Sequence, residues 1–204
     1  MLKLTSLDYI FIFLLIVSVV YLYDRQTRLR KLLPYNSKLK PVKILSVVAG
    51  NNLDMTEIEK SLYSTDITYN LLPYTSVNQD SLLAELDKDV TVFELSSHGL
   101  NGSFRLGNAS IPASWLANAL SQYKSLQCVL LLYCNSYIDQ QLMLVSKAFV
   151  ISLVGDVKDT SCITFARNFY YFLNKNFDYK EAFDRAKLHL PVEDYAKFVY
   201  LDGR

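Results

Sequence analysis

The sequence predicts an α/β fold with a mostly parallel central sheet, preceded by one N-terminal transmembrane helix. Short apolar runs rich in β-branched residues alternate with amphipathic segments, which is typical of a parallel sheet covered by helices on both faces. Two of these runs end in polar clusters that hold the most reactive side chains of the chain. Near the N-terminus, a continuous apolar segment has about the length that crosses a bilayer as a helix.

The composition fits one domain of ordinary size with an appendage. The chain has 204 residues, of which 51% are hydrophobic, and a formal net charge of +1. Such a chain can build a sizeable core, and it has no overall positive field that would attract nucleic acid. Its three cysteines are Cys128, Cys134 and Cys162. An odd and sparse count argues against a disulfide framework and fits a reducing compartment.

The segment at residues 7–23 is predicted to cross a membrane once. It contains one charged residue, Asp8, close to its end, and tyrosines flank its apolar centre like an interfacial aromatic belt. The basic residues that follow it are Arg25, Arg28, Arg30 and Lys31. Lys3 stands alone on the other side, so the positive-inside rule places the C-terminal part in the cytoplasm.

Two other interpretations of this segment fit less well. A cleaved signal peptide would need a small-residue cleavage site, and a buried core helix would be apolar on one face only. The expected organisation is therefore a transmembrane anchor with its basic flank at residues 1–31, a tether at 32–41 and a globular domain at 42–204.

Each expected element follows from local pattern. Apolar runs bounded by glycine, proline or polar residues predict strands at 42–49, 67–72, 90–97, 128–133, 150–154 and 196–201. Amphipathic spacing predicts helices from Asp54 or Thr56 to about 63, then at 76–87, 114–123, 140–149, 160–174 and 179–188. Ser114 is the expected cap of the third of these helices. The glycine-bearing stretch at 101–111 resembles a hairpin.

His98 and Cys134 are the candidate catalytic residues. His98 follows the strand predicted at 90–97, and Cys134 follows the one predicted at 128–133. In open parallel sheets, functional side chains collect beyond the carboxyl ends of the strands, so these two are expected to face one another. A thiol beside an imidazole is the usual arrangement of an activated sulfur nucleophile.

The remaining reactive side chains are interpreted as structural. Cys128 begins a buried-type strand and Cys162 lies at a helix start, while His189 sits late in an amphipathic helix. The sequence has no Cys-x-x-Cys pair, its two histidines are far apart, and it has no glycine-rich phosphate loop. We therefore expect no metal and no cofactor.

Residues 42–190 resemble the caspase-like cysteine proteases, and most closely their CHAT branch. The resemblance rests on the residues Phe93–Gly99 (Phe-Glu-Leu-Ser-Ser-His-Gly) and on 129–136 (Val-Leu-Leu-Leu-Tyr-Cys-Asn-Ser). It continues through the valine–glycine turn and aspartates at 154–159, the aromatic helix at 165–173 and the alanine-bearing helix at 181–186. The resemblance implies a caspase-like three-layer sandwich.

The resemblance also implies peptide-bond hydrolysis through an acyl-enzyme. Cys134 would be the nucleophile and His98 the general base and then acid. The backbone N–H groups of Gly99 and Cys134 would form the oxyanion hole. Asp159, with Asp156 as its nearby substitute, stands where relatives that cut after basic residues have a pocket-lining carboxylate. The competing interpretation of Asp159 is that it caps the following helix.

Taken together, the sequence predicts a membrane-anchored cysteine endopeptidase with its catalytic domain facing the cytoplasm. By resemblance, a role in a prokaryotic antiviral-defence or regulated-death system is plausible. Its expected partners are a protein or peptide substrate and the membrane, with activation by a partner protein or by a homo-oligomer left open. The alternative is a catalytically inactive, membrane-tethered caspase-fold interaction module. Tyr133 favours that alternative, because the CHAT branch usually has a small residue before the cysteine and a tyrosine could crowd the thiol.

Overall fold

The structure is a computed structural model that describes residues 42–49, 67–73, 76–100 and 102–203. Residues 37–204 form one compact unit. The predicted membrane segment at 7–23, the tether and the predicted helix ending at about 63 lie outside the described residues. In the part of the chain that the structure does describe, no helix combines the length and apolar character needed to cross a membrane.

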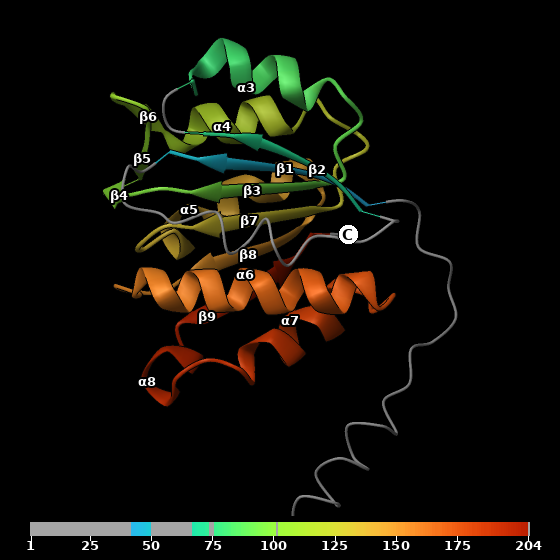
Figure 1. Cartoon of the computed structure of the whole chain (residues 1–204). Coiled ribbons are helices and arrows are strands. Elements are labelled where there is room, and N and C mark those ends of the chain that lie inside the picture. The colour runs from blue at the N-terminus through green and yellow to red at the C-terminus, as the bar shows by residue number, and fades with distance from the viewer. Residues whose placement is uncertain (1–41, 50–66, 74–75, 101, 204) are drawn as a thin grey trace, which may run out of the picture. The chain divides into compact units, whose positions relative to one another are not determined.

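A six-stranded, mostly parallel sheet forms the centre of this unit (Figure 1). Its strands are β1 (Val42–Val48), β2 (Ile67–Leu72), β3 (Val92–Ser96), β7 (Cys128–Leu132), β8 (Phe149–Leu153) and β9 (Phe198–Asp202). Their order across the sheet is β2-β1-β3-β7-β8-β9, and only β9 runs antiparallel to its neighbour. The parallel core of the sheet is as the sequence predicts.

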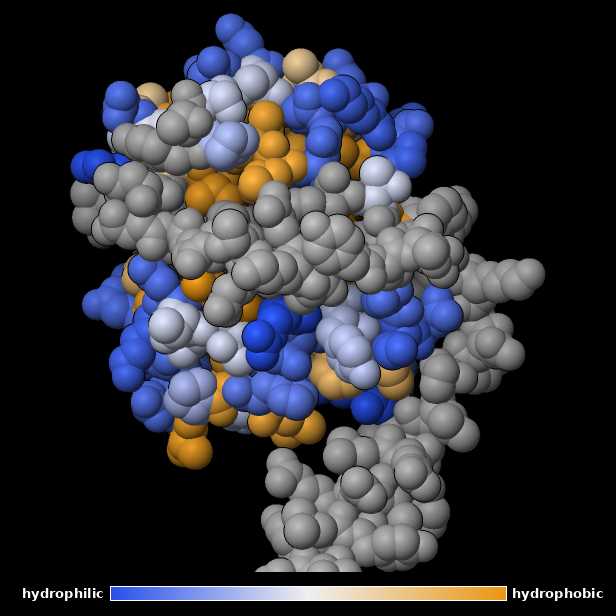
Figure 2. All heavy atoms as spheres, viewed as in Figure 1, coloured by the Kyte–Doolittle hydropathy of each residue, from blue (hydrophilic) through white to orange (hydrophobic). Residues whose placement is uncertain are grey.

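Helices cover both faces of the sheet and complete three layers (Figure 1). One face carries α3 (Gln79–Leu86), α4 (Ala113–Leu120), α5 (Tyr137–Met143) and the short 3₁₀ helix η1 (Leu144–Ser146). The opposite face carries α6 (Asp159–Asn174), α7 (Tyr179–Lys187) and α8 (Val192–Tyr195). In Figure 2, hydrophilic side chains make up most of the visible outer surface of both helical layers, and apolar side chains are visible below the upper layer and at the lower edge.

Alternation along the strands divides the core into two clusters. On β7, Cys128, Leu130 and Leu132 face α6 and α7, whereas Val129 and Leu131 face α3 and α4. The α6 cluster is rich in stacked aromatic rings, such as Phe165 against Phe198 with ring centroids 4.6 Å apart. Burial on both faces explains why the central strands read as nearly continuous apolar runs.

A second, three-stranded antiparallel sheet follows β3 directly. It comprises β4 (Gly99–Leu100), β5 (Ser103–Leu106) and β6 (Ala109–Pro112). Phe104, Leu106 and Ile111 anchor it in the α4-side cluster. The glycine-bearing stretch that resembles a hairpin is thus part of a small sheet that begins at the residue after His98.

Several local predictions need correction. Ser114 does not cap α4, because the helix begins at Ala113 with Pro112 at its N-cap and has no side-chain cap bond. Helix α5 begins at Tyr137 rather than at residue 140, and Phe149 belongs to β8 rather than to the preceding helix. The structure also contains α8, which the sequence pattern did not indicate. A four-residue helix is too short to show periodicity.

Candidate active site

His98 and Cys134 lie at equivalent positions on adjacent strands. The last paired residues of β3 and β7 are Ser96 and Leu132, and each candidate lies two positions beyond its strand's paired residue. The backbone N–H of Ser97 donates to the carbonyl of Leu132 at 3.4 Å, which extends the pairing toward the site. His98 is exposed and Cys134 is partly exposed. Parallel pairing therefore brings two residues 36 positions apart in the sequence to the same edge of the sheet.

Gly99 makes the closest approach between the two strand ends. A Cβ atom placed on Gly99 would lie 2.5 Å from the carbonyl oxygen of Cys134 and 2.4 Å from Cδ2 of Tyr133. Contacts under 3.0 Å are not tolerated by real Cβ atoms, so the backbone after the histidine can pass the cysteine only because residue 99 is glycine.

Polar bonds shape the turn that carries Cys134. Asn135 adopts a left-handed conformation with φ of 60°, which asparagine tolerates better than most residues. The Ser136 hydroxyl donates to the carbonyl of Leu131 at 2.8 Å and accepts from the N–H of Leu153 at 2.8 Å, so it bridges β7 and β8. The strand-end pattern marks the Cys-Asn-Ser cluster as a candidate site, but it does not indicate these structural roles of Asn135 and Ser136.

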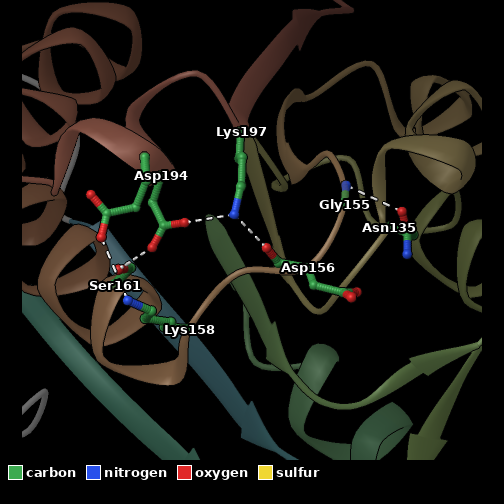
Figure 3. A network of polar contacts seen from close by, with 8 residues as sticks. Asn135, Gly155, Asp156, Lys158, Ser161, Asp194 and Lys197 are labelled. Atoms are coloured by element: carbon green, nitrogen blue, oxygen red, sulfur yellow. Dashed lines mark hydrogen bonds and ion pairs between the residues drawn. The ribbon is translucent and has the colours of Figure 1, made fainter.

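The same turn is tied to the loop after β8. Asn135 donates its backbone N–H to the carbonyl of Gly155 at 3.1 Å, and its side-chain oxygen accepts from the N–H of Gly155 at 3.1 Å. Figure 3 shows this pair together with the polar network next to it. There, Lys197 donates to the carbonyl of Asp156 at 2.7 Å and to Asp194 at 2.8 Å, and Asp194 accepts from Ser161 at 2.6 Å.

This network fixes the loop against two other elements. The hydrogen bond from Lys197, followed by that from Ser161, holds the pKa of Asp194 below its usual range, so its carboxylate stays ionised. Because Lys197 comes just before β9 and Ser161 lies in the first turn of α6, the network joins three segments next to Gly155. The turn that carries Cys134 is therefore hydrogen-bonded to a loop that is itself held in place by this network.

Tyr133 is directed away from solvent and into the α4-side core. Only 2% of the residue is exposed, its ring centroid lies 6.1 Å from that of Phe104, and its hydroxyl donates to Asp139 at 2.8 Å. Burial, reinforced by the charge of Asp139, raises the pKa of the Tyr133 phenol. Tyr133 therefore fills the space beneath Gly99, and its position does not support the expectation that it crowds the thiol.

The other two cysteines are buried, as the sequence predicts. Cys128 is 0% exposed at the start of β7, and Cys162 is 8% exposed in the first turns of α6. Burial raises the pKa of the Cys162 thiol, and the negative charge of Asp159 raises it further. A thiol of raised pKa is a poor nucleophile at neutral pH. Of the three, Cys134 has the exposure that nucleophilic attack requires.

The predicted substrate-binding aspartates are both exposed. Asp156 offers its carbonyl to Lys197, and in Figure 3 its carboxylate extends away from the network. Asp159 is the first residue of α6, whose N-cap is Lys158 with no side-chain cap bond. The interpretation of Asp159 as a helix cap is therefore wrong.

A pocket of about 430 Å³ opens beside His98. Its lining comes from His98 and from the small sheet, and comprises His98, Gly99, Ser103, Phe104, Arg105 and Ser110.

Within the described ranges, no group of three or more histidine, cysteine or carboxylate side chains could hold a metal ion.

The architecture is similar to that of a solved cysteine proteinase. The Arg-specific cysteine proteinase gingipain R matches with a TM-score of 0.52 and 12% sequence identity, over 84% of this chain and 46% of that one. The fold resembles that of caspase-like cysteine proteases. The chain spans about half the length of this structural neighbour. No protein-family model and no curated protein matches the sequence.

Proposed function

We propose that the chain is a caspase-like cysteine endopeptidase that acts through Cys134 and His98. The observation that carries the proposal is the placement of both residues two positions beyond the paired ends of β3 and β7, with Gly99 packed against the Cys134 carbonyl. A fold similar to that of a cysteine proteinase supports it. This is the edge of a parallel sheet at which catalytic side chains usually gather.

The chemistry proceeds in two steps. His98 takes the proton of the Cys134 thiol, and the thiolate attacks the carbonyl carbon of the scissile peptide bond. His98 then gives that proton to the leaving amine as the C–N bond breaks, which leaves a thioester. In the second step, His98 takes a proton from water, whose oxygen attacks the thioester carbonyl. The C–S bond then breaks to release the carboxylic acid, and His98 returns the proton to the Cys134 sulfur, which restores the thiol.

The backbone N–H groups of Gly99 and Cys134 serve as donors to the oxyanion that forms in each step. Their two segments are in van der Waals contact, because the Gly99 Cα packs against the Cys134 carbonyl. One such donor contributes roughly 2.7–4 kcal/mol to transition-state stabilisation in enzymes where it has been removed.

Cleavage after arginine or lysine is the specificity that we propose. Asp159 and Asp156 follow β8, the neighbour of the strand that ends at Cys134, and both carboxylates are exposed to a ligand. The structural neighbour is described as Arg-specific. Asp159→Ala should weaken cleavage of peptides with arginine at the cleaved position much more than that of peptides with a neutral residue there. A cleavage profile dominated by aspartate at that position would contradict this specificity without affecting the dyad.

Residues 7–23 supply a single-pass anchor in this proposal, and the catalytic domain faces the cytoplasm. The basic cluster at 25–31 supports that orientation. Removing residues 1–30 should release a soluble domain. A reporter enzyme that works only in the cytoplasm should be active when it is fused after Arg204.

A role in prokaryotic defence or regulated death follows from the CHAT-like resemblance. Cell viability after induction of the protein, with Cys134 intact or replaced, tests that role.

One observation favours the second candidate, an inactive interaction module: no hydrogen bond joins the side chains of His98 and Cys134, both of which are described. Such bonds often form only when substrate is present, so the enzyme does not require one in this structure. Iodoacetamide labelling separates them. Selective labelling of Cys134 that is lost in His98→Ala supports the enzyme, whereas labelling no faster than that of Cys128 supports the module.

A further inference from the structure

The pocket beside His98 includes four residues that the proposed catalytic steps do not use: Ser103, Phe104, Arg105 and Ser110. Its lining includes His98 and five residues from β4, β5 and β6, and Cys134 is not part of it. Alternation along β5 places Ser103 and Arg105 on one face of the small sheet, with Phe104 on the other. Since Phe104 is 1% exposed and Arg105 is exposed, the arginine face is the one open to solvent.

Arg105 is held in place by the segment that carries His98. Its backbone N–H donates to the carbonyl of His98 at 3.1 Å, and its own carbonyl accepts from the Ser97 hydroxyl at 2.7 Å. Arg105 is directly paired with Ser110, whose hydroxyl donates to that of Ser103 at 3.3 Å. Arg105 therefore has a fixed backbone position, and Ser103 and Ser110 are its neighbours in the small sheet.

The charge of Arg105 has no protein partner in the described residues. None of the ion pairs found there includes it, although five other basic side chains on the described surface are paired with carboxylates. A guanidinium presents five N–H donors in a planar fork that matches a carboxylate. An unpaired arginine on the wall of a pocket therefore fits an anionic group supplied by a ligand.

The position of the pocket determines which part of a substrate it meets. The general acid that protonates the leaving amine must lie on the leaving-group side of the scissile bond. His98 has that role in the proposed function and lines this pocket, so the pocket adjoins the residues after the scissile bond. Asp156 and Asp159 follow β8, which lies beyond β7 on the other side of Cys134.

We propose that Arg105, together with Ser103 and Ser110, forms a subsite for an acidic side chain in the first two residues after the scissile bond. The proposal rests on the proposed function and extends it to the leaving-group side. With acidic residues on the acyl side and a basic one on the leaving-group side, the site selects peptides in which a basic residue is followed by an acidic one.

Cleavage of a matched peptide panel tests the subsite. The peptides share arginine at the cleaved position and carry glutamate, glutamine or lysine at the two following positions. The full-length protein should cleave the glutamate peptide about five-fold more efficiently than the glutamine peptide, as expected for a partly exposed ion pair. Arg105→Gln should remove that preference, and Arg105→Glu should reverse it toward lysine. Arg167→Gln, on the exposed face of α6, is the matched control and should retain the wild-type order.

A binding measurement separates this subsite from the proposed reaction. Fluorescence anisotropy with labelled peptides is carried out on full-length Cys134→Ala, with and without Arg105→Glu. If the glutamate peptide binds most tightly and Arg105→Glu reverses that order, the subsite is supported. Absence of cleavage by the wild-type protein would then contradict only the proposed function. Equal binding of all three peptides, no binding of any of them, or an order that Arg105→Glu leaves unchanged would overturn the subsite.

Discussion

Two buried tyrosine–carboxylate pairs, one on each face of the sheet, have the same chemistry and different positions. On the α6 face, the Tyr170 hydroxyl donates to Glu94 in the middle of β3, and both residues are fully buried. On the α4 face, the Tyr133 hydroxyl donates to Asp139 across the turn that carries Cys134. The first pair joins residues 76 positions apart and the second joins residues six apart.

The difference shows how one interaction can serve the scaffold or the site. The Tyr170–Glu94 pair fastens α6 to the sheet, so its loss should act on stability. The Tyr133–Asp139 pair brackets Cys134 and places the Tyr133 ring beneath Gly99, so its loss should act on the geometry of the proposed nucleophile.

The largest effect is expected at Cys134 itself. Cys134→Ala should reduce peptide cleavage about 10⁴-fold or more, because the proposed nucleophile is lost, and should leave the free energy of unfolding nearly unchanged. Cys128→Ser is the control at the other end of β7, where the thiol is fully buried. It should destabilise the fold and keep the activity per folded molecule. If Cys134→Ala retained cleavage, the Tyr133–Asp139 pair would not border a catalytic residue.

Gly99→Ala should have the next largest effect. The added methyl group would meet the Cys134 carbonyl and the Tyr133 ring, so the strand ends must separate. Separation of about 1 Å at a catalytic site can reduce activity about 100-fold, and overpacking should reduce the free energy of unfolding by about 2 kcal/mol. Kinetic assays and urea denaturation measure the two effects.

Gly155→Ala provides the matched control for Gly99. Nothing lies within 4 Å of an added Cβ there, but φ is +71°. The left-handed backbone should cost about 1–2 kcal/mol of stability without steric pressure on Cys134. Equal losses of activity in the two variants would show that contact with the cysteine is not the specific cause of the loss in Gly99→Ala.

On the scaffold side, Glu94 should make stability depend on pH. Burial raises its pKa from 4.5 to about 7, against the opposing effect of hydrogen bonds from Tyr170 and Ser96. Between these values, the folded state holds a proton that the unfolded chain has released. Stability should therefore fall as the pH rises from about 4.5 to about 7, by about 3 kcal/mol in total, and change no further through this group above that.

Glu94→Gln isolates that contribution. The amide has the same shape and no charge, so denaturation curves at pH 5 and pH 8 should differ less for the variant than for the wild type. Cleavage at a fixed pH should be unaffected once folding is complete. A slope that persists in Glu94→Gln would assign the pH dependence to other groups.

The smallest effects should come from removing one hydroxyl from each pair. Tyr170→Phe and Tyr133→Phe each leave a buried carboxyl with one bond fewer, at a cost of about 1–3 kcal/mol. Only Tyr133→Phe should also lower kcat, since it loosens the turn around Cys134, whereas Tyr170→Phe should change stability alone. Equal kcat values for the two variants would remove the functional distinction between the pairs.

The sequence by itself determined the parallel sheet and the edge at which its reactive side chains meet. Strands buried on both faces are apolar throughout, and the polar clusters that interrupt them mark where the strands end. Because parallel strands end at the same edge, His98 and Cys134 could be predicted to lie close together without knowing any contact. The burial of Cys128 and Cys162 followed from the same patterns.

Only the tertiary structure decided which way individual side chains face and which distant residues they meet. Tyr133 turns into the core because Asp139 offers it a partner and Gly99 leaves room for its ring. The pairing of Glu94 with Tyr170 and the position of Arg105 beside His98 depend on how α6 and the small sheet pack, which local periodicity does not specify. Periodicity reports the environment of one residue at a time, whereas these contacts join segments that come together only when the chain folds.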